Sequence, residues 1–277
     1  MDSVLALFTC YNRKEKTRQA VRGLVEGNPE VQFSFVIVDD ASTDGTPEML
    51  KTEDFGAPIQ VVQGTGGLFY SGGMALGMEK ILKSGQEAQY LLMMNDDVEF
   101  DPGCIRRLIA QSKAQGNAVI IGATYDHGGQ LSYSAIKYEK GIHYRQLPPG
   151  ETGVDADTMN ANCVLIPFYW FRRAGVMDRH YRHSLGDFDY GLALRDAGAK
   201  LHVSRDYVGI CCDNPVAGTW HDRSLGPIAR IKKKETVKGD PAGPWFYYLR
   251  KHFGLFTAIR SSLTPYIRIL LLSLIHI

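Results

Sequence analysis

The stretch Leu91–Val98 reads LLMMNDDV, in which four apolar residues lead directly into two adjacent carboxylates, Asp96 and Asp97. An uninterrupted apolar run of this length is typical of a strand buried on both faces. Open α/β sheets bind ligands beyond the carboxyl ends of their strands, which is where these carboxylates would lie. Because neighbouring like charges favour a divalent cation, the stretch predicts a Mg²⁺ or Mn²⁺ site shared with substrate phosphates. A polar turn is the alternative, since Asp is common in turns.

The chain before this stretch repeats the order strand, polar loop and helix. Apolar runs predict strands at residues 4–8, 33–38 and 59–62, and the second of them also ends in a carboxylate pair, Asp39 and Asp40. Strands that alternate with helices in this rhythm indicate parallel βαβ units with right-handed crossovers. We therefore expect an α/β fold with a Rossmann-like, mostly parallel sheet flanked by helices.

A glycine-rich loop at residues 64–74 lies between the third predicted strand and the helix that leads to the opening stretch. So many glycines predict a backbone that approaches another group closely or takes positive φ angles. The loop lacks the Gly-Lys-Ser/Thr ending of a P-loop and fits a dinucleotide fingerprint poorly. Further on the pattern loosens, and we expect a hairpin with loops over residues 123–157 and a long loop from residue 212 to 244.

Composition limits the class of protein. Of the 277 residues, 44% are hydrophobic and 22% charged, as in a globular protein with one large α/β domain or two small ones. The net charge of +1 offers no global electrostatic argument for a nucleic-acid partner. None of the five cysteines forms a C-x-x-C pair, which argues against a disulfide framework or zinc site and for a reducing cytoplasm. Nothing in the first 260 residues is predicted to act as a signal peptide or to span a bilayer.

Four motifs in this order and spacing resemble those of glycosyltransferase family 2, the inverting, nucleotide-sugar-dependent enzymes with the A-type α/β fold. They are TCYNR at residues 9–13, VDDASTDGT at 38–46, NDD at 95–97 and GDFDY at 186–190. The resemblance covers about residues 4–205. The glycine-rich loop and the segment DTMNAN at residues 157–162 look like the rhamnosyltransferase-like bacterial branch of that family.

The resemblance implies a single catalytic domain with a helical C-terminal tail. The catalytic domain would comprise residues 1–212, divided into a nucleotide-binding half, 1–122, and an acceptor-binding half, 123–212. Residues 213–271 would form a flap loop and an amphipathic helical tail. The last six residues, 272–277, look foreign to such a chain, and we expect them to be a non-native end.

The donor implied by the resemblance is a UDP- or dTDP-sugar. Thr9 and Tyr11 would line the nucleobase pocket, and Asp40 would accept a hydrogen bond from the ring N–H of uracil or thymine. A turn before a helix is the alternative role of Asp39 and Asp40, because Asp is favoured there. The residues expected to bind the nucleotide-sugar are Thr9, Tyr11, Arg13, Asp40, Gly67, Gly72 and Asp96.

A Mg²⁺ or Mn²⁺ ion is implied on the leaving-group side, where it would neutralise the charge that develops on the β-phosphate. Asp97 would ligate this ion, whereas Asn95 stands where many relatives carry Asp and would not. His221 is a second candidate ligand. A structural histidine held by hydrogen bonds is the alternative for that residue.

The resemblance makes Asp187 the general base that takes the proton from the acceptor hydroxyl. The family usually has Glu-Asp here, and this chain has Gly186 before Asp187, so one carboxylate is missing. A first-turn carboxylate that interacts with the helix dipole is the alternative role. The residues expected to contact the acceptor, a glycan or a lipid-linked saccharide, are Asn160, Asn162, Asp189 and Trp220. Asn is also frequent in turns, and Asp189 could instead orient its neighbours.

The tail, residues 245–268, mixes aromatic and basic side chains. Such amphipathic, basic helices often lie on membrane surfaces, and packing against the catalytic domain is an equal alternative. Trp220 and the basic run at residues 230–234 would form either a flap over the diphosphate or a solvated loop. We expect a cytoplasmic protein, at the inner face of the membrane if the tail binds lipid.

Two other functions stay open. A nucleotide- or saccharide-binding module with a disabled site would account for Gly186 in place of the usual carboxylate. A sugar-phosphate nucleotidyltransferase also uses metal-binding carboxylates on an α/β sheet. That class would need a glycine-rich loop with Arg and Lys directly after the first strand, where this chain offers only Arg13 and Lys14.

Overall fold

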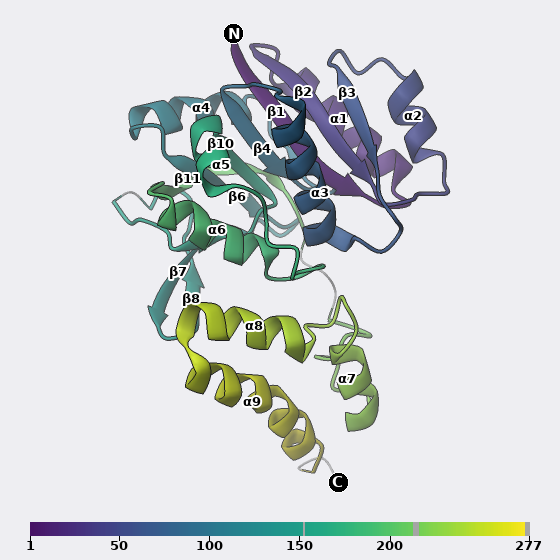
Figure 1. The fold of residues 1–277 in the computed structure, drawn as a ribbon, viewed down its shortest axis with the longest axis vertical. Helices are drawn as coiled ribbons and strands as arrows, with labels where there is room; N and C mark the ends of the chain where they lie inside the picture. The colour runs from purple at the N-terminus through teal and green to yellow at the C-terminus, as the bar shows by residue number, and fades with distance from the viewer. Residues whose placement is uncertain (152, 213–215, 275–277) are drawn as a thin grey trace.

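The computed structural model describes residues 1–151, 153–212 and 216–274. Within these ranges the chain forms an eight-stranded sheet, a three-stranded sheet and nine helices (Figure 1). In spatial order the large sheet contains β3 (Ile59–Gln63), β2 (Val31–Asp39), β1 (Asp2–Cys10), β4 (Tyr90–Met94), β10 (Cys163–Pro167), β6 (Val119–Tyr125), β11 (Leu201–Ile210) and β5 (Glu99–Phe100). The small sheet contains β8 (His143–Gln146), β7 (Ala135–Lys140) and β9 (Thr158–Met159).

The large sheet is mixed but mostly parallel. Strands β1 to β4 run in one direction, and β6 is parallel to β11. Between these two groups β10 pairs with β4 and β6 and is antiparallel to both. The predicted mostly parallel sheet flanked by helices is confirmed. The antiparallel direction of β10 could not be read from its apolar run, because strands of either direction look alike when both faces are buried.

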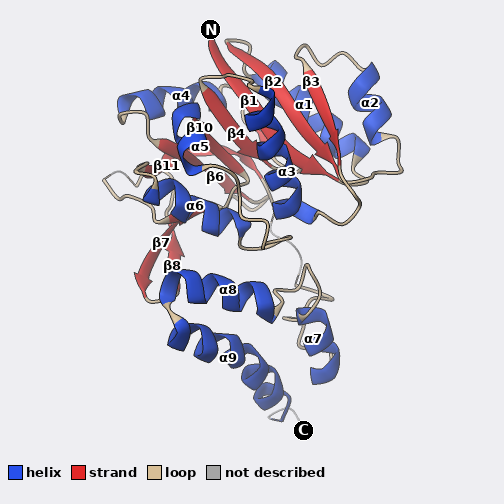
Figure 2. Ribbon diagram, viewed as in Figure 1, coloured by secondary structure: helices blue, strands red, loops and turns tan. Residues whose placement is uncertain are grey.

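Helices cover both faces of the large sheet (Figure 2). One group contains α3 (Phe69–Ser84), α5 (Phe168–Ala174) and α6 (Gly186–Asp196), and the other contains α1 (Lys14–Gly27), α2 (Thr46–Thr52) and α4 (Cys104–Ala114). A hydrophobic core lies on each face of the sheet, and alternate residues of β1 point into the two cores. Leu5 and Leu7 pack with the first group of helices, and Ala6 and Phe8 pack with the second. This alternation explains why the central strands are apolar throughout.

Glycines in α3 allow that helix to lie unusually close to the sheet. A Cβ atom on Gly73 would lie 2.5 Å from Thr9 Oγ1, and one on Gly77 would lie 2.3 Å from Leu7 Cδ1. The predicted close approach of the glycine-rich segment is therefore to the protein's own first strand. It brings the first turn of α3 next to the end of β1, where the predicted donor residues begin.

The C-terminal part corrects one prediction. The basic run expected in a long loop belongs to a helix, α7 (Pro227–Lys234), which has Pro in its first turn. Two further helices follow, α8 (Ala242–Phe253) and α9 (Leu255–Leu274), and with α7 they form a layer apart from the sheet (Figure 1). Of the end expected to be non-native, residues 275–277 lie outside the described part of the chain. Across the described residues, no helix combines the length and apolar character needed to cross a bilayer.

Candidate active site

A large cavity lies between the sheet-containing part of the protein, residues 1–212, and the tail helices α7 to α9. Its volume is about 1210 Å³, and Asn95, directly after β4, forms part of its wall. Other lining residues are Tyr70 of α3, Asn160 and Asn162 before β10, Asp187 of α6, Trp220, and Arg260 and Arg268 of α9. The cavity therefore begins at the carboxyl end of a central strand, as expected for ligands of α/β sheets.

Arg13 bridges the two carboxylates that follow Asn95. Its Nη1 donates to Asp96 Oδ1 at 2.9 Å and to Asp97 Oδ2 at 3.0 Å. Asp96 is buried and also accepts from Thr17 Oγ1 at 3.2 Å. Burial raises the pKa of the Asp96 carboxyl, and the Arg13 guanidinium opposes that rise. The positive charge that the acidic pair requires is thus supplied, in this structure, by a neighbouring side chain.

Asp97 fits a metal that is completed by substrate. Its side chain is 33% exposed, whereas that of Asp96 is 5% exposed, so Asp97 is the carboxylate open to an ion from solvent. Among the described residues, no three His, Cys, Asp or Glu side chains converge on a point that could hold a metal. Magnesium often binds through one or two carboxylates plus phosphates and water, and one carboxylate is what the site offers. The exposed His221 lies against the Trp220 ring, tilted by 32° with centroids 3.7 Å apart, and its role as a ligand stays a prediction.

Asp40 holds the glycine-rich loop. Its Oδ1 accepts the Gly66 N–H at 2.7 Å, and its Oδ2 accepts the N–H groups of Leu68 at 2.9 Å and Phe69 at 3.1 Å. The carboxylate is 5% exposed. A pyrimidine N–H would therefore have to share this carboxylate with backbone donors, and a carboxylate has about four acceptor positions with which to do so.

The other residues predicted to bind the nucleotide-sugar lie near the carboxyl end of β1 and around the start of α3. Thr9 Oγ1 donates to the Val38 carbonyl at 3.1 Å, and Tyr11 is 54% exposed. Gly67 accepts a hydrogen bond on its carbonyl from Arg182 at 2.7 Å, and Gly72 donates its N–H to the Arg182 carbonyl at 3.2 Å. Arg182 thus ties the glycine-rich loop to the segment before α6, a link that the sequence did not predict.

Asp187 lies in the first turn of α6 and faces the cavity. Its Oδ2 accepts the Ala161 N–H at 3.2 Å, and its Oδ1 accepts its neighbour's N–H, that of Phe188, at 2.9 Å. These backbone donors fix the orientation of the carboxylate. Burial raises its pKa from the ordinary 3.8 to about 6, although both backbone N–H groups act in the opposite direction. A carboxylate with this pKa is largely ionised at pH 7 yet basic enough to accept a proton.

Packing explains the glycine before Asp187. A Cβ atom on Gly186 would lie 2.4 Å from Ser71 Oγ and 2.7 Å from Met177 Sδ. The first turn of α3 therefore occupies the place where a larger residue would stand. A carboxylate side chain at residue 186 is therefore incompatible with the way α3 and α6 pack in this protein.

Three of the four residues predicted to contact the acceptor substrate line the cavity: Asn160, Asn162 and Trp220. Asn162 joins the two halves of the site, because its carbonyl accepts the Asn95 N–H at 3.1 Å. The side-chain amide of Asn162 donates to Cys211 Sγ at 3.2 Å. The same sulfur atom lies 3.9 Å from Asp97 Oδ1. The Trp220 indole N–H donates to Asp240 at 3.2 Å, which places the ring in the wall beside the tail.

Asp189 has other partners. It is 3% exposed, and its carboxylate accepts hydrogen bonds from Tyr181 at 3.2 Å, Lys251 Nζ at 2.9 Å and His252 Nε2 at 2.7 Å. It does not line the cavity. These contacts make Asp189 an anchor between α6 and α8, which agrees with the structural role considered for it. A direct contact of Asp189 with the acceptor stays a prediction.

Basic side chains from distant segments also line the cavity. They are Lys140, Arg182, Lys234, Arg260 and Arg268, against the carboxylates Asp187 and Asp240. Lys234 is 1% exposed and lies 5.7 Å from the Trp220 ring centre and 5.1 Å from that of Tyr266. Only Lys234 belongs to the run singled out in the sequence. The others come from separate segments and carry no local signal. Such a cationic wall suits an anionic ligand.

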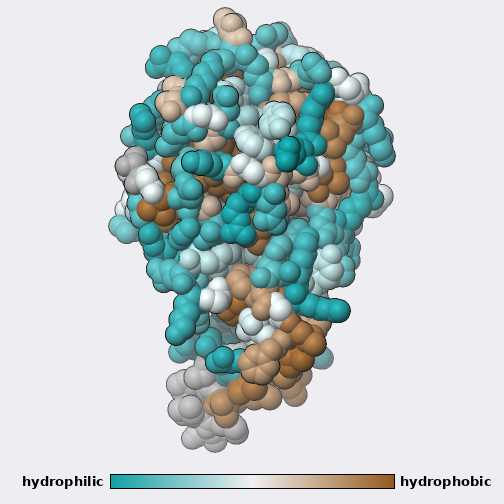
Figure 3. All heavy atoms as spheres, turned by 60° about the vertical axis from the view of Figure 1, so that its left-hand side comes forward, coloured by the Kyte–Doolittle hydropathy of each residue, from teal (hydrophilic) through white to brown (hydrophobic). Residues whose placement is uncertain are grey.

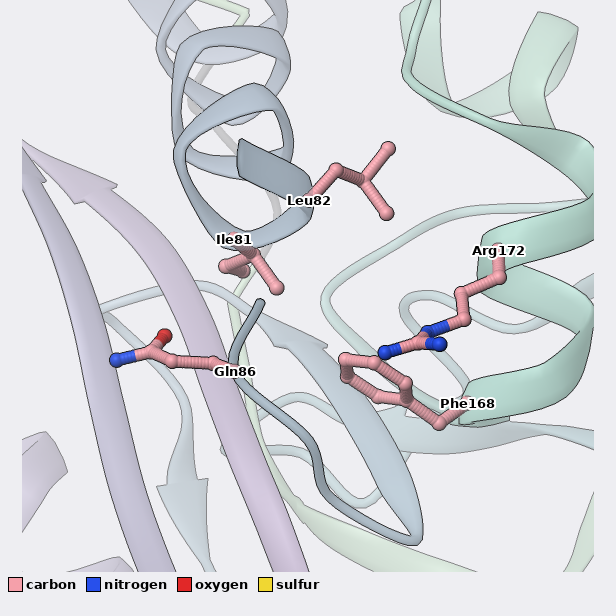
Figure 4. Close-up of a pocket in the computed structure, with 5 residues that line it drawn as sticks. All are labelled: Ile81, Leu82, Gln86, Phe168 and Arg172. Carbon is pink, nitrogen blue, oxygen red and sulfur yellow. The ribbon is translucent and has the colours of Figure 1, made fainter. Parts of the chain in front are cut away.

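A second, smaller cavity lies away from these residues (Figure 4). It has a volume of about 270 Å³ and is lined by Ile81, Leu82, Gln86, Phe168 and Arg172. Phe168 donates its N–H to the Gln89 carbonyl just before β4, so this cavity lies at the amino end of that strand. No predicted site residue lines it.

Comparison with known proteins gives the family. The model described as Glycosyl transferase family 2 matches residues 6–181. None of the curated proteins compared with the chain matches it. Two solved structures share the fold at low identity. TarS of S. aureus is 12% identical with a TM-score of 0.57 over 97% of this chain. GalNAc-T7, solved with UDP, GalNAc and Mn²⁺, is 13% identical with a TM-score of 0.54 over 96%.

These likenesses support the A-type fold and no more. The chain spans 49% of the TarS chain and 55% of the GalNAc-T7 chain. The family match is of a different kind, since it extends over more than half of this chain and includes three of the four motifs from which the resemblance was drawn. We conclude that this protein belongs to glycosyl transferase family 2.

Proposed function

We propose that the protein transfers a sugar from a UDP- or dTDP-sugar to a hydroxyl of a glycan or lipid-linked saccharide, with inversion at the anomeric carbon. One observation carries this proposal. The oriented carboxylate of Asp187 lines the same cavity of about 1210 Å³ as Asn95, the residue that directly precedes the acidic pair after β4. The proposed base therefore shares one space, large enough for two substrates, with the residue next to the proposed leaving-group site.

In the proposed reaction Asp187 accepts the proton of the acceptor hydroxyl while that oxygen attacks the anomeric carbon. The bond between this carbon and the β-phosphate oxygen breaks, and the nucleoside diphosphate leaves from the opposite side. The backbone N–H groups of Ala161 and Phe188 hold the carboxylate in place. With a pKa of about 6, the base is ionised at neutral pH.

The leaving diphosphate would lie toward the cationic wall. Arg182 and the tail residues Arg260 and Arg268 provide positive charge there that needs no rearrangement during the reaction. Asp97 would hold a Mg²⁺ or Mn²⁺ ion, which supplies charge neutralisation on the β-phosphate when bound. The Mn²⁺ and UDP in the GalNAc-T7 structure, which has the same fold, support this assignment by analogy.

The donor is proposed to be a UDP-hexose or dTDP-rhamnose, the second because the glycine-rich loop and the segment at residues 157–162 resemble the rhamnosyltransferase-like branch. The reaction is proposed for the cytoplasm, in keeping with five cysteines of which none belongs to a C-x-x-C pair.

The test is a transfer assay against a panel of UDP- and dTDP-sugars with Mn²⁺, after a thermal-shift screen has selected the stabilising donor. We expect Asp187→Asn to lower kcat by about 10²- to 10⁴-fold, the usual contribution of a general base. Wild-type kcat/KM should fall about tenfold per pH unit below pH 6, as the carboxylate becomes protonated. Asp196→Asn is the matched control, because it changes an exposed carboxylate at the end of the same helix.

Wild-type rates in Asp187→Asn would show that another group acts as the base. Metal-dependent UDP binding without turnover of any donor would instead identify a binding module. The clash at Gly186 weighs against that second outcome, because it gives the absent carboxylate a packing reason rather than a functional one.

A further inference from the structure

Helix α9 exposes a continuous apolar face. The side chains concerned are Leu255, Phe256, Ile259, Leu263, Ile267, Leu270 and Leu271, and each is between 48% and 79% exposed. Their spacing of three to four residues places them along one side of the helix. Figure 3 shows hydrophobic atoms gathered at the tail end of the molecule. Soluble surfaces rarely carry so large a contiguous apolar patch without a partner.

The remaining sides of α9 are occupied. Ala258, Ser262 and Ile269 are buried on one side. The other side, with Arg260, Ser261, Thr264 and Arg268 among its residues, lines the large cavity. The helix therefore has three faces: one packed against the protein, one lining the cavity and one exposed and apolar, with Phe256 belonging to both of the last two. The exposed face and the cavity face are adjacent, because the residues of the second follow those of the first by about one position along the chain.

Charge is strongly divided along the chain. Residues 227–274 contain nine Lys or Arg and two Asp or Glu. Residues 1–226 contain 22 Lys or Arg and 28 Asp or Glu. No acidic residue follows Asp240. The apolar face of α9 therefore belongs to a region with a net charge of +7, although the whole chain is near neutral.

We propose that α9 docks this protein on an anionic lipid bilayer, lying flat in the interface with its exposed apolar face toward the acyl chains. The charge of the region fits anionic headgroups, each nearby Lys or Arg being worth about 1 kcal/mol at such a surface. The apolar stripe supplies the hydrophobic part of the attraction. A second copy of this chain fits less well, since each copy would bring seven exposed cations, all nine except the buried Arg230 and Lys234, against two carboxylates.

This docking does not depend on the proposed sugar transfer, but it has a consequence for it. Because the cavity face of α9 adjoins the docking face, the cavity that contains Asp187 would open beside the headgroup layer. An acceptor anchored in the bilayer by a lipid could then present its hydroxyl to Asp187 without leaving the membrane.

The experiment is co-sedimentation of the full chain with vesicles of phosphatidylcholine, or of phosphatidylcholine with about 30% phosphatidylglycerol as the anionic lipid. We expect binding to the anionic vesicles that weakens as salt is raised, and at least tenfold weaker binding to neutral ones. Leu263→Asp combined with Ile267→Asp should reduce anionic-vesicle binding at least about tenfold, because two charges would enter the apolar layer. The matched control is Leu82→Asp with Tyr169→Asp, which changes exposed apolar residues on α3 and α5 instead.

Circular dichroism and Tm would check that both double variants are folded, and Leu270→Ser with Leu271→Ser is a milder substitution on the same face. The proposal is overturned if the wild-type chain stays in the supernatant with anionic vesicles, or if the α9 variants bind as well as the control. It is also overturned if light scattering shows a dimer that the α9 substitutions dissociate while vesicles bind none of the variants or the wild type. Sugar transfer to a soluble acceptor should be unchanged in the α9 variants, so failure of docking and failure of the proposed function give different results.

Discussion

The carboxylate of Asp187 is held where ionisation is unfavourable, and this has a measurable effect on stability. Its pKa in the folded protein is about 6, above the ordinary 3.8. Below about pH 4 the group is protonated in both the folded and unfolded states. As the pH rises through 6, the folded protein must ionise a poorly solvated carboxyl, and the stability present in acid is lost.

We therefore expect Asp187→Asn to gain stability relative to the wild type between pH 4 and pH 7, by on the order of 1–3 kcal/mol. Tm measured for both proteins across that range gives the difference directly. Asp196→Asn should show no such trend. A constant difference between Asp187→Asn and the wild type at all pH values would mean that the pKa of Asp187 is not raised.

Arg13 pairs with both Asp96 and Asp97, the residues of the proposed leaving-group site. Arg13→Gln should lower the free energy of unfolding by about 1–2 kcal/mol, less than for a buried pair because the guanidinium is half-exposed. Mn²⁺ with UDP should then raise the Tm of the variant more than that of the wild type, because the ion would replace the lost positive charge. Arg106→Gln, which affects one long and exposed ion pair, is the control. Equal metal-dependent shifts in all three proteins would argue against an ion at Asp97.

At the scale of elements, the attachment of the tail helices to the sheet-containing part depends on contacts of α8 with α6 and its neighbours. Asp189 of α6 pairs with Lys251 and His252 of α8, and Tyr247 donates to Asp178 at 3.0 Å. Tyr138, on β7, shares a hydrogen bond with Tyr248. These contacts join a helix pair to a site more than 50 residues earlier in the chain, and they hold α9 against the cavity.

Asp189→Asn should destabilise the protein by about 2–4 kcal/mol, because it removes the charge that Lys251 and His252 face in a buried place. Urea unfolding measures this, and limited trypsin digestion should cut the tail sooner in the variant. Asp196→Asn, on the same helix, should behave as the wild type in both assays. Unchanged stability and digestion would mean that α8 is held by its aromatic contacts alone.

At the scale of the whole molecule, the cavity is built from both ends of the chain. Asp187 belongs to α6, in the sheet-containing part, and Arg260 and Arg268 belong to α9, the last described helix. We expect Arg260→Gln with Arg268→Gln to raise KM at least about tenfold, since one lost contact to a charged group is commonly worth 1.5 kcal/mol or more. The assay would use a soluble acceptor, so that membrane binding plays no part. Arg250→Gln on α8, which does not line the cavity, should leave KM unchanged, and the same KM in all variants would place substrates away from the tail.

Much of the fold was predictable because its signals are local. The apolar runs gave the central strands, and alternate burial of Leu5 and Ala6 on two faces explains why those runs are continuous. The helix α7 was missed because its basic residues suggested a solvated loop, although Gly226 and Pro227 before them are a helix-start signal. Burial of Lys234 against Trp220 and Tyr266 is what makes that segment ordered, and no local pattern reveals such a contact.

Asp187 became a candidate base through the resemblance to the family, whereas the sequence by itself determined the strand–helix order and the carboxylates at the ends of β2 and β4. These depend on residue type and short spacing, which the chain displays directly. Tertiary structure decided which of those residues share one space and what neutralises each charge. Arg13 lies between Asp96 and Asp97, Ser71 excludes a side chain at Gly186, and arginines of α9 face the cavity beside Asp187. The physical reason is that burial and Coulomb interaction depend on distance in space, and that distance is set only when segments far apart in sequence pack together.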